Sequence, residues 1–300
     1  MKADAGKGTL RALDWLNFFL ADVQTGVGPF LAVYLAANHW NPQQVGIVLT
    51  CGGLAGVVAR TPGGALVDAT HRKRLLLGIG VVILSGAALM LALRPAFWYV
   101  AGSQVVLGAL GAVLMPTVAA ITLGLVGAKE FDRRFGRNQS FNSAGNVAAA
   151  LAMGGIGYWI SNRAIFFAVP ALAIPCLACL RGIDPTKIDY GRSRGARDEG
   201  EKDGASGLRA LLSDRRLLTF GACIALFHFA NAAMLPQLGE MLAHGRAKMA
   251  APFMSACVIV TQFVIAVSAV WIGGKAASWG RKPLLLIGFA CYRFGVCCIP

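Results

Sequence analysis

Charged side chains are scarce in this chain. Only 14% of its 300 residues are Asp, Glu, Lys or Arg, whereas soluble domains carry about 25%. Hydrophobic residues make up 56% of the sequence, and the mean hydropathy is +0.62. Apolar side chains in this proportion cannot all be hidden from water inside a soluble fold, so the sequence predicts a protein whose solvent is a lipid bilayer.

Acidic residues are scarcer than basic ones. The chain has 14 Asp and Glu against 28 Lys and Arg, which gives a net charge of +14. Such an excess would suit nucleic acid, but these basic residues lie in the loops between apolar runs, as they do in membrane proteins. The sequence therefore argues against a nucleic-acid partner and for the bilayer.

Patterns that carry catalytic chemistry are also missing. There is no nucleophile elbow, phosphate-binding loop, zinc-ligand spacing or pair of catalytic carboxylates. Cys176 and Cys179 have the spacing of a redox or metal motif, but they lie in an apolar run without a nearby His or acid, which favours small buried helix residues. We therefore expect neither an enzyme nor a bound metal or cofactor.

Apolar runs of membrane-spanning length dominate the chain. A membrane helix needs about 20 apolar residues. Predicted spans cover residues 15–37, 44–67, 75–93, 97–125, 141–160, 164–180, 217–238, 252–273 and 284–300. These runs predict an all-α polytopic membrane protein, with the ninth span reaching the C-terminus.

Lys and Arg predict the orientation of these spans. They concentrate in the N-terminal segment and in every second loop, including the hydrophilic segment 182–207. Because cytoplasmic loops carry the excess of Lys and Arg, we expect a cytoplasmic N-terminus and a cytoplasmic central loop, in a plasma membrane such as the bacterial inner membrane.

One short charged loop occurs twice. Between the second and third spans, residues 64–74 read Gly-Ala-Leu-Val-Asp-Ala-Thr-His-Arg-Lys-Arg, and residues 273–283 repeat the pattern without its acid. The positions shared by the two copies, together with the acid of the first, are Gly64, Asp68, Arg72, Lys73, Gly273, Arg281 and Lys282. A duplicated loop predicts two related halves, as in many secondary transporters.

This loop resembles the signature of the major facilitator superfamily, which reads Gly, three residues, Asp, two residues, Gly, Arg and then Lys or Arg. His71 stands at the second glycine, and Ala277 replaces the acid in the second copy. The resemblance implies two pseudo-symmetric helical halves, here 1–182 and an incomplete 213–300, joined by a linker at 183–212. Because the superfamily usually has twelve spans, we expect a C-terminal truncation or a frame change near Ala290.

The resemblance also implies a gating latch at this loop. Asp68 ends a helix whose dipole is negative there, so it gains stability from a cation or a helix N-terminus in the other half. Gly64 is expected to let a neighbouring helix approach closely. The alternative is a solvated cluster that only sets the topology, and it stays open for Arg72, Lys73 and Arg74.

Polar side chains within the predicted spans are candidates for the transport path, because they are costly in lipid. Asn142 and Asn146 continue a stripe that begins at Asn138, close to the interface and expected to be wet. Hydrogen bonds between helices are the alternative role for this stripe. The further candidates are Asn17, Gln24, Gln104, His228, Asn231 and Gln262.

Asp22 is the best candidate for coupling to a proton or cation, because it is a carboxylate well inside the first span. Its alternative is a structural role, either as partner of Arg60 or at a backbone gap near Gly28. Gln104 stands where proton-linked members of the family often have Arg, which weakens coupling through the fourth span.

The sequence thus predicts a monomeric secondary transporter that moves a small solute by alternating access, with uptake and efflux both open. A non-transporting membrane protein of the same fold, a remnant or a sensor, is the alternative. The expected partners are the solute, a coupling proton or cation, and the lipid bilayer.

Overall fold

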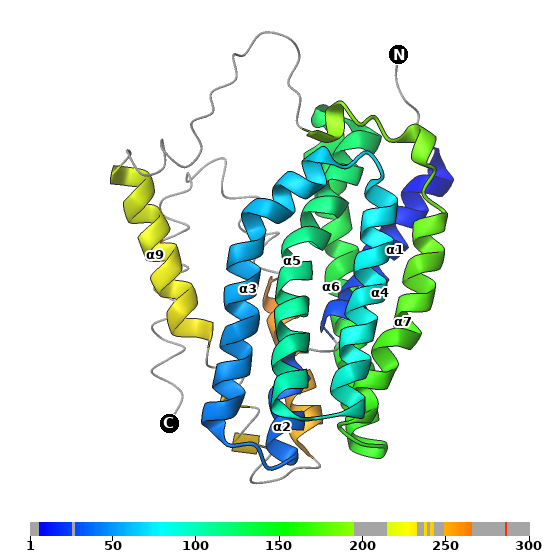
Figure 1. The fold of residues 1–300 in the computed structure, drawn as a ribbon. Coiled ribbons are helices and arrows are strands. Elements are labelled where there is room, and N and C mark those ends of the chain that lie inside the picture. The colour runs from blue at the N-terminus through cyan, green and yellow to red at the C-terminus, as the bar shows by residue number, and fades with distance from the viewer. Residues whose placement is uncertain are drawn as a thin grey trace. The chain divides into compact units, whose positions relative to one another are not determined.

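The computed structural model describes residues 6–25, 28–194, 215–232, 237–238, 241–242, 249–265 and 286. Every regular element within these ranges is a helix, which confirms the predicted all-α fold (Figure 1). The chain divides into two compact units, residues 1–201 with 235–259, and residues 202–234 with 260–300. Most of the described residues belong to the first unit.

Helices cover most of the first eight predicted spans, while the ninth, 284–300, lies outside the described residues except for Leu286. The helices are α1 (Lys7–Thr25), α2 (Gly28–Ala37), α3 (Pro42–Ala69), α4 (Lys73–Leu93), α5 (Phe97–Val126), α6 (Ala128–Trp159), α7 (Ala164–Arg181) and α9 (Arg215–Ala232). A further helix covers Met249–Ile265, and short 3-10 turns cover Pro185–Lys187 and Arg192–Arg194. By length and apolar composition, α3, α4, α5 and α7 are able to cross a membrane.

Two helices differ from the prediction. The first predicted span consists of α1 and α2, which lie on either side of residues 26–27, outside the described residues. The fifth span was expected to begin near Phe141, but α6 begins at Ala128 and runs for 32 residues. Its first turns are charged and carry no hydropathy signal, so a prediction based on apolar runs assigned them to a loop.

Local chemistry explains where several helices begin. Asn41 and Gln44 form a capping box at the start of α3, with Asn41 Oδ1 accepting from the Gln44 N–H at 2.8 Å. Gly127 separates α5 from α6 with a φ of 73°, which glycine adopts without strain. The turn between α3 and α4 contains no residue with positive φ, so His71 fits where the family signature has glycine.

Close packing of α3 on α5 depends on glycines. A Cβ atom on Gly108 would collide with the carbonyl oxygen of Gly52, and one on Gly63 would lie 3.0 Å from Val113 Cγ2. Around Gly64, in contrast, no described atom lies within 4 Å of such a Cβ. Among the described residues the close approach to α5 occurs one residue earlier, at Gly63, and the role of Gly64 stays a prediction.

Contacts at the two ends of the first unit agree with the predicted alternation of loops. At one end, Arg74 after the α3–α4 turn hydrogen-bonds the last carbonyls of α7, and the Asp189 N–H donates to the Gly124 carbonyl on α5. At the other end, Arg163 before α7 donates to the Ala92 carbonyl near the end of α4. The loops at the two ends of α4 and α7 therefore lie at opposite ends of the first unit, as the sequence predicted. The end with more basic residues lies near the start of α1.

Candidate functional site

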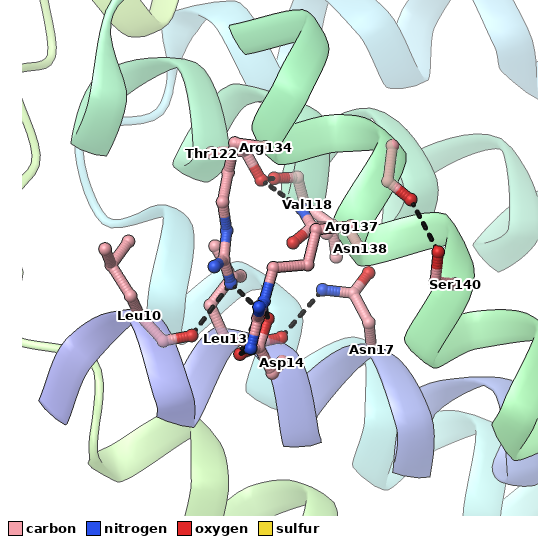
Figure 2. Close-up of polar contacts among 11 residues, drawn as sticks. Leu10, Leu13, Asp14, Asn17, Val118, Thr122, Arg134, Arg137, Asn138 and Ser140 are labelled. Atoms are coloured by element: carbon pink, nitrogen blue, oxygen red, sulfur yellow. Dashed lines mark hydrogen bonds and ion pairs between the residues drawn. The ribbon is translucent and has the colours of Figure 1, made fainter. Parts of the chain in front are cut away.

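A buried ion cluster joins α1 to α6 at the basic end of the bundle (Figure 2). Asp14 on α1 accepts hydrogen bonds from Arg134 Nη2 at 2.6 Å and from Arg137 Nη2 at 2.9 Å. Arg134 also donates to the Leu10 carbonyl at 2.8 Å. The side chain of Asp14 is only 4% exposed and that of Arg134 only 9%, whereas that of Arg137 is 58% exposed. The cluster is therefore one buried pair with a second arginine closing it from outside.

Burial and charge act in opposite directions on Arg134. Desolvation lowers the pKa of its guanidinium, while the charge of Asp14 opposes that shift. For Arg137, the hydrogen bond to Asp14 raises the pKa. Both arginines stay protonated, so the cluster holds two positive charges around one carboxylate. Removing that carboxylate would leave Arg134 buried without a counter-ion.

Amide side chains extend this cluster toward α5. Asn138, which follows Arg137 on α6, donates to Thr122 Oγ1 at 2.9 Å, and Thr122 donates in turn to the Val118 carbonyl (Figure 2). Asn17 donates to the Leu13 carbonyl at 2.7 Å on its own helix. Asn138 was expected to be wet, but it is only 1% exposed. Its role among the described residues is therefore to link two helices.

Deeper along α6, Asn142 and Asn146 form the next part of the polar stripe. Asn146 Nδ2 donates to Asn142 Oδ1 at 3.2 Å, and both residues remain partly exposed. Between them, Gly145 makes the closest approach to α1, because a Cβ atom there would collide with the Phe18 carbonyl. The polar stripe thus runs beside the contact between α1 and α6, and its Asn142 and Asn146 side is partly exposed.

Asp22 lies on the same interface but has a different environment from Asp14. It is 3% exposed, faces the backbone of Ala149 on α6, and lies near Cys176 on α7. Its Oδ1 atom has no hydrogen-bond partner among the residues that the structure describes. Arg60 is exposed and forms no ion pair among the described residues. The structural alternative in which Asp22 pairs with Arg60 is therefore wrong.

Gln24 and Gln104 each have a buried amide nitrogen without a hydrogen-bond partner in the described part of the chain. Gln24 lies near the end of α1, while Gln104 lies on α5 against Gly52 of α3. Ser103, beside Gln104, also has a buried hydroxyl without a partner. Buried polar atoms are almost always hydrogen-bonded in proteins. These atoms are therefore available to a ligand or to water.

The loop between α3 and α4 divides into a structural and an exposed part. Lys73 is fully buried and donates from Nζ to the Val67 carbonyl at 2.6 Å, which ties the turn to the end of α3. The side chains of Asp68 and Arg72 are exposed and make no hydrogen bond or ion pair within the described ranges. Lys73 therefore does not belong to a solvated cluster, as its alternative role required.

The remaining candidates lie partly or wholly outside the described residues. Gly273, Arg281 and Lys282 fall in 266–285, which the structure does not describe. His228 and Asn231 lie on α9, with the placement of their side chains outside the described part. Gln262 lies on the helix Met249–Ile265 and is partly exposed. Their roles remain predictions.

Asp14, Arg134 and Arg137 were not singled out by the sequence. Arg134, Arg137 and Asn138 lie three and four residues apart, which places them on one face of a helix. That spacing, with an acid just before the first span, was the available signal. It was missed because the segment was assigned to a loop, where such spacing has no meaning.

Comparisons with known proteins agree with this arrangement. The family model described as Major Facilitator Superfamily matches residues 14–300. Two similar relatives are uncharacterized MFS-type transporters of Mycobacterium tuberculosis, one from strain CDC 1551 / Oshkosh and one from strain ATCC 25618 / H37Rv. Each is 43% identical over 284 residues, which cover 93% of this chain and 68% of the relative.

Proposed function

The chain belongs to the major facilitator superfamily, and from that premise we propose a secondary transporter that moves one small solute by alternating access. Membrane transport is the general function of the family, and the helical fold is consistent with it. In the proposed cycle, two helical halves rock about a solute site near the middle of the membrane.

Asp22 carries this proposal. A carboxylate buried among membrane helices is costly unless it is neutralised or paired, and Asp22 has neither an ion-pair partner among the described residues nor a hydrogen bond to its Oδ1. Binding a proton or a small cation removes that cost. We assign Asp22 as the coupling acid, whose occupancy decides which arrangement of the halves is stable.

The proposed solute contacts are amides near this acid. Asn142 and Asn146 present a partly exposed pair on α6, and Gln24 and Gln104 have buried amide nitrogens without partners. Amide groups both donate and accept hydrogen bonds, which suits a polar, uncharged part of a solute. The further proposed contacts are Asn17, His228, Asn231 and Gln262.

A latch at the α3–α4 turn completes the proposed cycle. Asp68 is exposed at the C-terminal end of a helix, where its negative charge is unfavourable. A cation or helix N-terminus of the other half would relieve this cost in one state and release Asp68 in the other. Gly64, Arg72, Gly273, Arg281 and Lys282 remain members of this proposal, with Lys73 holding the turn.

We place the N-terminus and the central loop in the cytoplasm and the protein, as a monomer, in the plasma membrane. The distribution of Lys and Arg supports this orientation. The coupling gradient determines whether transport is uptake or efflux. The experiment that tests the coupling also tests this direction.

The test is solute-induced proton movement in vesicles. The chain is reconstituted with a pH-sensitive dye inside, and a panel of solutes is added without a membrane potential. We expect at least one solute to change the internal pH in vesicles with the protein and not in empty vesicles. The change should disappear in Asp22→Asn. It should persist in Asp184→Asn, which alters an acid beyond the end of α7 whose carboxylate accepts hydrogen bonds from Thr186.

A result in which Asp22→Asn moves protons as the unmodified chain does would remove Asp22 from the mechanism. Solute flux without any proton or cation movement would instead identify a uniporter. The coupling role of Asp22 would then be rejected, while the proposal of solute transport would stand.

A further inference from the structure

A groove of about 650 Å³ runs along the outer side of α4 and α7, apart from the α1–α6 interface. Its apolar lining comes from Leu75, Gly78, Ile79, Val82, Ile83, Leu177 and Leu180. Several of these side chains are exposed, including Ile79 at 48% and Val82 at 57%. In a membrane protein such a surface faces lipid, so the groove is a recess that an acyl chain can enter.

Three arginines close the basic end of this groove. Arg72 lies directly before α4, Arg74 lies in its first turn, and Arg181 is the last residue of α7. Arg74 donates from Nε to the Leu180 carbonyl at 3.1 Å and from Nη2 to the Arg181 carbonyl at 3.2 Å. Arg74 therefore fixes the ends of the two helices together and holds the mouth of the groove in place.

Arg72 and Arg181 keep their guanidinium groups available. Both residues are exposed, and neither guanidinium makes a hydrogen bond or ion pair within the part of the chain that the structure describes. Asp184, an acid that feels the charge of Arg74, accepts from the Thr186 N–H and hydroxyl, and these bonds lower its pKa. The mouth of the groove thus carries unneutralised positive charge.

The length of the groove matches one leaflet. From Leu75 to Ile83 the helix rises about 12 Å, and the hydrocarbon part of one leaflet is about 15 Å deep. Arginines at the helix ends therefore lie at the level of the lipid headgroups, while the apolar lining lies beside the acyl chains. Tyr190 also lines the mouth, where a phenol can hydrogen-bond a glycerol or phosphate oxygen.

We propose that this groove binds an anionic phospholipid, with the phosphate held by Arg72 and Arg181 and one acyl chain lying between α4 and α7. Guanidinium groups suit phosphate because their planar donors pair with its oxygens. The basic end is also the predicted cytoplasmic end, where anionic lipids provide the negative surface that attracts such clusters. The bound lipid would connect the α3–α4 turn to the end of α7.

Native mass spectrometry of the full chain tests the proposal. The protein is reconstituted in phosphatidylcholine that contains a minor fraction of phosphatidylglycerol, released into mild detergent, and weighed with its retained lipids. We expect one retained phosphatidylglycerol in the unmodified chain. Retention of phosphatidylglycerol should fall roughly fivefold in Arg72→Gln and roughly fivefold in Arg181→Gln. The attraction of one arginine to an anionic lipid surface corresponds to about a fivefold change in binding.

Two matched controls separate the site from general charge. Arg133→Gln removes an arginine at the same end that is 87% exposed and lies outside the groove, so it should retain phosphatidylglycerol. Val82→Trp fills the apolar part and leaves all three arginines, so it should lose the lipid. Val57→Trp, at another exposed apolar position, should retain it.

Equal retention of phosphatidylcholine and phosphatidylglycerol, or equal loss in Arg133→Gln and Arg72→Gln, would overturn the proposal. So would retention that survives Val82→Trp but is displaced by inorganic phosphate, because the arginines would then bind a soluble anion. Size-exclusion profiles would show whether the variants are folded, and we expect folding because both substituted arginines are exposed.

Discussion

Asp14 and Asp22 are two carboxylates on one helix, both buried against α6, and they are held in opposite ways. Asp14 accepts four hydrogen bonds from two arginines. Asp22 has one oxygen atom, Oδ1, with no hydrogen-bond partner within the described ranges. One end of the α1–α6 interface is therefore electrostatically complete, while the middle of the same interface is not.

The difference shows what each acid contributes. A buried ion pair gives little net stability over an apolar contact, but losing one partner is costly because a charge is left behind. Asp14 therefore fixes the position of α1 on α6. Asp22 has no comparable ion pair among the described residues, and a proton or cation is the partner proposed for it.

The largest expected loss of stability is for Asp14→Ala. This change leaves the buried Arg134 guanidinium without its counter-ion and should cost about 3–5 kcal/mol. Thermal unfolding in detergent would measure it. Asp68→Ala is the matched control, since Asp68 is an exposed acid at the same end and should change stability by less than about 0.5 kcal/mol. Equal losses in the two variants would show that the ion cluster does not hold the helices.

Gly145→Val should have the next largest effect. The added side chain meets the Phe18 carbonyl on α1, which is backbone and cannot rotate away. We expect a loss of about 3 kcal/mol, at the upper end of overpacking, with the contacts of both acids disturbed. Gly136→Ala on the same helix has open space around it and should leave the unfolding temperature unchanged or slightly higher. A Gly145→Val protein as stable as the unmodified chain would contradict this close approach.

Arg134 and Arg137 should differ, although both contact Asp14. Arg134→Gln removes the buried hydrogen bonds to Asp14 and to the Leu10 carbonyl and should cost about 2 kcal/mol. It costs less than Asp14→Ala because Arg137 still neutralises the carboxylate. Arg137→Gln, at an exposed position, should lower the unfolding temperature less than Arg134→Gln. The reverse order would mean that the outer arginine carries the interaction.

The helices of the first unit could be predicted because each is a long apolar run with clear ends. Hydropathy alone places α3, α4, α5 and α7, and the Lys and Arg pattern agrees with the alternation of their ends. The charged start of α6 could not be found in this way, because the part of a helix that extends beyond the membrane is polar and gives no hydropathy signal.

The site was predicted in part. The composition of the spans indicated Asp22, Asn142 and Asn146, because polar residues stand out in apolar runs. The partners of Asp14 could not be identified, since they lie more than a hundred residues away in sequence and meet it only through the packing of α1 on α6. Gly63 and Gly64 could not be distinguished either, because only helix rotation decides which of them faces α5.

Asp22→Asn is expected to have the smallest effect on stability and the largest on transport, because the amide keeps the size of the side chain and removes an unsatisfied charge. The unfolding temperature should stay the same or rise, unlike that of Asp14→Ala.

The most direct test of the difference between the two acids is a paired flux measurement on Asp22→Asn vesicles, with exchange of labelled solute and accumulation against its gradient recorded in the same preparation. We predict that exchange persists while accumulation driven by a proton or cation gradient is lost. Accumulation at the level of the unmodified chain, in a protein of unchanged stability, would contradict the assignment of Asp22 as the coupling acid.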